Sequence, residues 1–112
     1  MHELSITRNI VALAAERAEG RRVEAVRLAI GKLTGIDVGA IRFCFDLCTD
    51  GTPLAGARLE IDEIPGRGAC PTCGEERVLE APLLRCPCAP GAMMKLVAGE
   101  ELLLRSMEVR DV

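Results

Sequence analysis

The chain is organised around two short stretches of sequence, CPTCG at residues 70–74 and RCPC at residues 85–88. A Cys-x-x-Cys followed by Gly is typical of a metal knuckle, in which a turn points backbone N–H groups at the sulfurs and the Gly adopts a conformation that a side chain resists. Four thiolates suit the tetrahedral preference of zinc, and the spacer between the pairs is near that of paired-cysteine zinc sites. We therefore predict a zinc site formed by Cys70, Cys73, Cys86 and Cys88.

The second cysteine pair is Cys-x-Cys, one residue shorter than the usual pair, so its backbone cannot repeat the geometry of the first knuckle. A disulfide pair or reduced thiols are the alternatives for these four residues.

Size and composition indicate one domain of 112 residues, or a small domain that carries a smaller insert. Phe43 and Phe45 are the only aromatic residues, so we expect a core of Leu, Ile, Val and Ala. The net charge of −3 and the dispersed basic residues argue against a nucleic-acid partner.

Cellular location is inferred from what the sequence contains. The first residues show no basic region that leads into an apolar run, and no apolar stretch approaches the length needed to cross a bilayer. We therefore expect no secretory signal and no membrane insertion, and we place the six cysteines in a reducing cytoplasm, where grouped thiols usually hold metal.

Hydrophobic periodicity predicts an α+β fold with a small sheet of about three strands and two helices. The expected helices cover residues 4–18, ended by Gly20, and 37–48, capped by Asp37. The expected strands cover residues 23–33, 57–64 and 101–109, and the apolar content of the last predicts that it is buried.

A zinc-ribbon-like module is expected to be inserted into this fold at residues 66–99. Residues 1–65, completed by a C-terminal strand within residues 100–112, would then form an α/β domain. Residues 65–68 and Gly99 predict flexible joints at the two ends of the module.

His2, the only histidine, is a second candidate metal ligand. A histidine so near a chain end is ordinarily exposed and without a role. Here the Met1 amine, the His2 amide nitrogen and the His2 imidazole can close fused chelate rings, and Glu3 can add an amide or carboxylate donor. Such a planar set of nitrogen and oxygen donors suits Ni(II) or Cu(II).

Other reactive side chains are better explained by packing. Cys44 and Cys48 share a helical stripe with Phe45, which indicates core positions, and adjacent Met93 and Met94 in an apolar run indicate packing rather than a copper(I) site. No histidine remains to pair with an acid, and neither a Gly-x-Ser-x-Gly nor a phosphate-loop motif is present, so no enzyme is predicted.

Several motifs together resemble the HypA/HybF family of hydrogenase maturation nickel metallochaperones. They are MHELSI at residues 1–6, RFCFD at 42–46, the paired cysteines, GEEL at 99–102 and SMEV at 106–109, and the likeness covers essentially the whole chain. The family usually has a Cys-x-x-Cys second pair, and some members have His beside the cysteines. This chain has neither feature, which leaves the all-sulfur site as the complete ligand set.

The resemblance implies that Ni(II) is a transient cargo held at Met1, His2 and Glu3 and that Zn(II) is structural. His2 would be the essential nickel ligand, while Met1 and Glu3 lend terminal and backbone donors. The implied partners are the GTPase HypB and the large subunit of [NiFe]-hydrogenase, and a homodimer is one possible oligomeric state. The alternative function is a zinc-ribbon interaction adaptor without metal delivery, and a thiol redox protein using Cys70 and Cys73 is a third reading.

Overall fold

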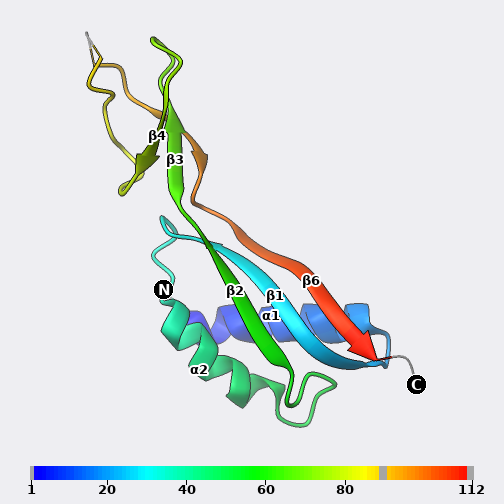
Figure 1. Ribbon diagram of the computed structural model, residues 1–112. Helices are drawn as coiled ribbons and strands as arrows, with labels where there is room; N and C mark the ends of the chain where they lie inside the picture. The colour runs from blue at the N-terminus through cyan, green and yellow to red at the C-terminus, as the bar shows by residue number, and fades with distance from the viewer. Residues whose placement is uncertain (1, 89–90, 111–112) are drawn as a thin grey trace. The chain divides into compact units, whose positions relative to one another are not determined.

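The computed structural model describes residues 2–88 and 91–110 (Figure 1). Its elements follow in the order α1 (Glu3–Ala18), β1 (Arg22–Gly31), α2 (Val38–Thr49), β2 (Arg58–Ile64), β3 (Gly66–Ala69), β4 (Glu76–Leu79), β5 (Lys95–Ala98) and β6 (Leu102–Arg110). Within the described residues the strands form two three-stranded sheets, ordered β2-β1-β6 and β4-β3-β5. The predicted α+β class is confirmed, and none of the described helices is both long and apolar enough to span a bilayer.

The chain divides into two compact units. The first unit comprises residues 1–29, 36–62 and 103–112, and the second comprises residues 30–35 and 63–102. The second unit contains the cysteine pairs, and it also includes the last two residues of β1 and the turn that follows them.

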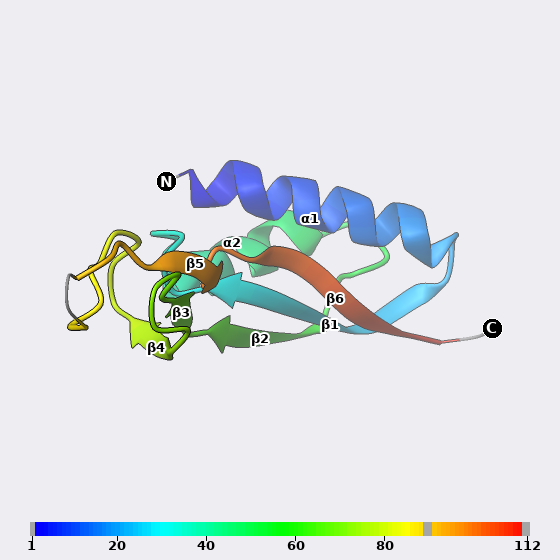
Figure 2. The ribbon, with the colours of Figure 1, turned by 90° about the horizontal axis from the view of Figure 1, so that it is seen from above.

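Two helices cover one side of the sheet in the first unit, as Figure 2 shows. In α1 the buried side chains recur at helical spacing, and the helix ends at Glu19, whose φ of 52° is left-handed. In α2 the predicted cap is confirmed, because the Asp37 carboxylate accepts a hydrogen bond of 3.1 Å from the Ala40 N–H. Ile41 and Phe45 of α2 are buried in this core.

Strand β1 is the centre of the first sheet and carries most of its buried residues. It runs parallel to β2, with α2 as the crossover, and antiparallel to β6 (Figures 1 and 2). The backbone bond from the Val23 N–H to the Pro53 carbonyl, 3.0 Å, fixes the start of the parallel register. On the sheet surface Arg27 pairs with Glu60 at 2.9 Å, so charged residues occupy the side that the helices leave open.

Strand β6 is less buried than its sequence predicts. Leu102 is 40% exposed and Leu103 is 52% exposed, so the expectation of a buried closing strand is wrong. The reason is the strand order: β6 lies at the edge of the sheet, where one side of the strand has no neighbouring strand to cover it.

The second unit is built on β3, which pairs antiparallel with both β4 and β5. Part of the joint expected at residues 65–68 belongs to this strand, because Gly66 and Gly68 lie within β3. A Cβ atom on Gly66 would stand 2.4 Å from the Leu79 carbonyl oxygen and 2.7 Å from Leu33 Cδ1. Gly99, with a φ of +117°, packs against the same point, so these glycines allow close backbone approach.

This packing predicts that Gly66→Ala destabilises the protein by about 1–3 kcal/mol, because the added methyl group overpacks a contact with backbone on the other side. Urea unfolding measures the change. Gly39→Ala is the control, since Gly39 lies in α2 and its added Cβ would meet only the Asp37 side chain, at 3.2 Å. Equal stability of the Gly66→Ala variant and the wild type would contradict the packing argument.

Candidate metal centre

The first cysteine pair forms the predicted knuckle. Cys70 follows β3, and its sulfur accepts hydrogen bonds from the Thr72 and Cys73 N–H groups, both at 3.4 Å. The Gly74 N–H donates to the Cys70 carbonyl at 2.9 Å and closes the turn, with Gly74 at a φ of +77°. The turn thus directs backbone donors at a sulfur, which stabilises its thiolate form.

The second pair is held by a different backbone arrangement. The Cys86 N–H donates to the Ala92 carbonyl at 2.8 Å, and the Met94 N–H donates to the Leu84 carbonyl at 2.9 Å. These bonds bring the residues before and after the pair side by side, so Cys86 is buried and Cys88 is half-buried. The shorter Cys-x-Cys is therefore positioned by pairing of its flanking segments rather than by a second knuckle.

The four predicted sulfurs converge. Sγ of Cys70 lies 3.6 Å from Sγ of Cys88, and Sγ of Cys73 lies 3.7 Å from Sγ of Cys86; all four atoms lie within 4.8 Å of one another. A tetrahedral zinc ion with Zn–S bonds of about 2.3 Å separates its sulfurs by about 3.8 Å, whereas a disulfide needs about 2.05 Å. All six cysteines are free, and the arrangement fits a tetrahedral thiolate site.

The pKa values of the four thiols also favour the binding of a divalent cation. Backbone N–H donation, first from Cys73, lowers the pKa of Cys70 to about 6. The Glu75 N–H lowers the pKa of Cys73, but the Cys70 sulfur, burial and Cys86 together raise it to about 11. The Cys88 N–H lowers the pKa of Cys86, while the Cys86 sulfur raises the pKa of Cys88. Because neighbouring thiolates repel, a metal ion is what allows all four sulfurs to ionise together.

An apolar shell surrounds the inner sulfurs. Leu79 and Met94 are buried in one cluster with Cys70 and Cys86, so the packing prediction for Met94 is confirmed, while Met93 is exposed. Cys44 and Cys48 are only half-buried, although Phe45 beside them is buried.

The N-terminal candidates lie at the start of α1. His2 is the N-cap residue, is exposed, and makes no side-chain cap hydrogen bond. Met1 lies outside the described residues. The Glu3 carboxylate accepts a hydrogen bond of 3.0 Å from the Asp37 N–H, and this bond is the main cause of its lowered pKa. Glu3 therefore ties the start of α1 to the start of α2.

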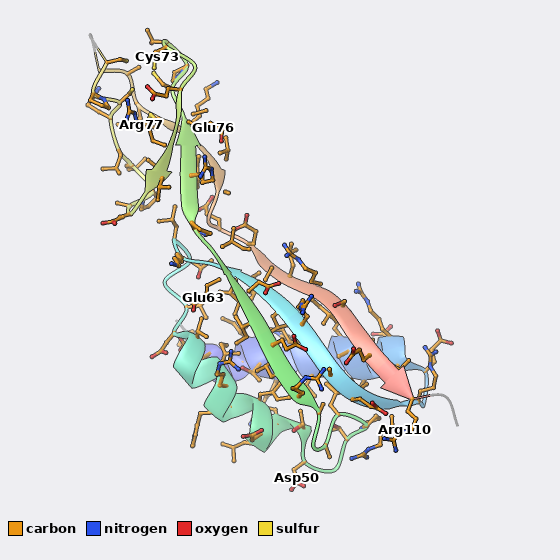
Figure 3. The ribbon with its side chains drawn as sticks, in the orientation of Figure 1. Asp50, Glu63, Cys73, Glu76, Arg77 and Arg110 are labelled. Carbon is orange, nitrogen blue, oxygen red and sulfur yellow. The ribbon has the colours of Figure 1, made fainter. Side chains whose placement is uncertain are left out.

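Sequence reasoning missed Arg77, whose guanidinium group lies against Cys86 and lowers the pKa of that thiol. Figure 3 shows Arg77 and Glu76 on opposite sides of β4. The alternation of side chains along a strand could have predicted this position. Arg77 shares a face of β4 with Leu79, which packs on the cysteine cluster. The bond between Glu3 and Asp37 was also missed, because it joins residues 34 positions apart with no local pattern.

Comparison with known proteins identifies related chains. The HypA family model, described as "Hydrogenase/urease nickel incorporation, metallochaperone, hypA", matches residues 1–109. The Hydrogenase maturation factor HypA of Nostoc punctiforme is 50% identical over 112 residues, which cover 100% of this chain and 98% of the relative. The protein of the same name from Geobacter metallireducens is 47% identical over 109 residues, 97% of this chain and 99% of the relative.

Solved structures agree in fold. The solution structure of the Ni metallochaperone HypA from Helicobacter pylori matches with a TM-score of 0.67 and 21% sequence identity, covering 97% of each chain. A second solution structure of a HypA protein matches with a TM-score of 0.66 and covers 98% of this chain and 97% of that chain. At this identity the likeness establishes the fold alone.

The convergence of sulfurs predicts that Co(II), used as a spectroscopic probe, saturates the cysteine cluster at one equivalent with the absorption of a tetrahedral thiolate site. Cys86→Ser and Cys88→Ser should each weaken binding and change that spectrum, because each removes one of four thiolates. Cys44→Ser is the matched control, since Cys44 lies outside the cluster. A Cys88→Ser spectrum identical to that of the wild type would remove Cys88 from the site.

Proposed function

The chain belongs to the HypA family of nickel-incorporation metallochaperones, and on that basis we propose that it carries Ni(II) at its N-terminus for the maturation of [NiFe]-hydrogenase. Metallochaperones carry a metal rather than transform a substrate, so the family places the chain outside the enzymes. The observation that carries the proposal is the position of His2, the only histidine, exposed and uncapped at the first turn of α1.

The helix start suits a metal that binds through backbone nitrogen. The first N–H groups of a helix have no intrahelical acceptor, so a metal can replace the protons on the His2 and Glu3 amides without breaking a helical bond. The His2 carbonyl still accepts from the Ile6 N–H at 3.1 Å, which keeps the first turn closed. With the Met1 amine and the His2 imidazole, these amides supply a planar nitrogen set of the kind that suits Ni(II).

Glu3 has a positioning role in this proposal. Its carboxylate is engaged by the Asp37 N–H, so the donor that Glu3 lends to nickel is its backbone amide. The hydrogen bond anchors the first residue of α1 to the start of α2 and so fixes the helix start that carries the chelating atoms. Its negative charge at a helix N-terminus also offsets the unfavourable interaction between a bound cation and the helix dipole.

The zinc ion has a structural role on Cys70, Cys73, Cys86 and Cys88. Four thiolates fill the tetrahedral shell of zinc and leave no position for a substrate or an exchanging ligand. Two of these sulfur ligands are buried to 2% exposure, which supports permanent binding. The nickel site, in contrast, is exposed and is built on a chain end, so a partner's ligands can replace its donors one at a time.

The remaining parts of the proposal follow from the family resemblance. The partners are the GTPase HypB and the large subunit of [NiFe]-hydrogenase, the transfer takes place in the cytoplasm, and a homodimer is one possible state of the carrier. The second candidate function is a zinc-ribbon adaptor that binds proteins without delivering metal. The structural support for the adaptor function is the cysteine cluster, and the nickel-carrier function includes the same cluster.

His2→Ala should strongly lower Ni(II) affinity, because it removes a direct ligand. Loss of an outer-shell partner costs about 10- to 100-fold in metal affinity, and the loss here should be larger. Calorimetric nickel titration measures the loss, and zinc content measured in parallel should stay at that of the wild type. A Gly-Ser extension before Met1 should weaken nickel binding as well, since it moves the terminal amine away from the chelate. Unchanged nickel affinity in both variants would favour the adaptor.

Glu3→Ala should lower Ni(II) affinity by about 10- to 100-fold, the range for an outer-shell partner, because it releases the Asp37 N–H. Glu3→Gln should bind nickel nearly as the wild type does, since its amide oxygen can accept the same hydrogen bond. Glu16→Ala, an exposed position of α1, is the control. If Glu3→Gln loses as much affinity as Glu3→Ala, the carboxylate charge rather than the hydrogen bond supports nickel binding, and the positioning role is wrong.

A further inference from the structure

Arg77 is a charged residue placed at the cysteine cluster without a described role. It lies in β4, where it pairs with Gly68 of β3 and shares a strand face with Leu79. Leu79 is buried in the cluster with Cys70 and Cys86, so the same face of β4 directs Arg77 toward the sulfurs. Figure 3 shows Arg77 in the unit that also carries the labelled Cys73.

Within the part of the chain that the structure describes, the guanidinium group has a hydrogen-bond acceptor for one nitrogen and none for another. One terminal nitrogen donates to the Glu75 carboxylate at 2.8 Å. The Nε–H group is buried and, among the described residues, donates no hydrogen bond. A buried donor without an acceptor costs free energy and therefore calls for an explanation.

The sulfur of Cys86 is the candidate acceptor beside this group. The Arg77 guanidinium lies close enough to Cys86 for each group to stabilise the charged form of the other. A neutral thiol is a weak acceptor, whereas a thiolate bound to a metal is a good one. A hydrogen bond from the guanidinium group is therefore stronger to a metal-bound Cys86 sulfur than to a neutral thiol.

The charge of the site points the same way. Four thiolates and one dication leave two negative charges uncompensated, in a cluster where Cys70 and Cys86 are buried. Burying such charge is unfavourable unless hydrogen-bond donors or a cation stand beside it. The knuckle supplies N–H donors to Cys70, and Arg77 stands beside Cys86 with both a donor and a positive charge.

We propose that Arg77 is an outer-shell residue of the zinc site, whose guanidinium group donates to the Cys86 thiolate while Glu75 holds that group in place. The inference rests on the proposed zinc site. The ion pair with Glu75 is largely exposed and adds little stability by itself, so its contribution is orientation. Arg77 would compensate the charge of one buried ligand and so strengthen the binding of zinc by the shorter Cys-x-Cys pair.

The test compares Arg77→Met with Arg77→Lys and with Arg67→Met. Arg67 is the matched control: it lies on β3, is paired with Glu76 at 3.5 Å, and occupies the strand face opposite to that of Gly66 and Gly68. Each protein is titrated with zinc in competition with a chromogenic chelator. Each is also titrated with Co(II), whose thiolate charge-transfer band reports on electron density at sulfur.

Arg77→Met should lower zinc affinity by about 10- to 100-fold, as loss of an outer-shell partner does. It should also move the charge-transfer band to longer wavelength, because a thiolate without its cationic donor gives up an electron more easily. Arg77→Lys should recover part of the affinity, since it keeps the charge but not the planar donor geometry. Arg67→Met should change neither quantity.

The outcomes separate the inference from its premise. If the wild type binds no zinc at the four cysteines, the proposed site itself is wrong and the role of Arg77 is wrong with it. If the wild type binds one zinc ion and Arg77→Met matches it in affinity and in band position, the site stands and the outer-shell role alone is overturned. A loss of affinity in Arg77→Met with no band shift would mean that Arg77 supports the fold rather than the thiolate.

Discussion

The convergence of four sulfur atoms is the constraint on which the second unit depends. Its buried hydrophobic cluster contains Cys70, Leu79, Cys86 and Met94, so half of that cluster consists of the cysteines themselves. A core of this size supplies little stability, and small folds of this kind usually need a metal or a disulfide. Sulfur separations of 3.6 and 3.7 Å are those of metal ligands, so an ion would complete the unit.

The two proposed metal sites require different chemistry. A permanent structural ion needs buried, soft ligands that fill its coordination shell, and the cysteine cluster offers these. A cargo ion needs accessible donors that can be released one at a time, and a chain end with a single exposed histidine offers those. Since sulfur and nitrogen ligands prefer different metals and geometries, the two sites need not compete for one ion.

Much of the fold could be predicted from local patterns, and what could not depends on tertiary arrangement. Helical spacing and the Asp37 cap predicted both helices, and the cysteine motif predicted the cluster. The burial of β6 was mistaken because apolar content does not reveal which strand takes the edge of a sheet. The place of Gly66 in a strand was missed because a glycine needed for close packing and a glycine in a loop look alike in sequence.

X-ray absorption at both metal edges, on protein with an authentic N-terminus and one equivalent each of zinc and nickel, tests the two-metal account most directly. The account predicts four sulfur neighbours at about 2.3 Å from zinc and only nitrogen and oxygen neighbours around nickel. Sulfur scattering at the nickel edge would place the cargo on the cysteines and contradict the account.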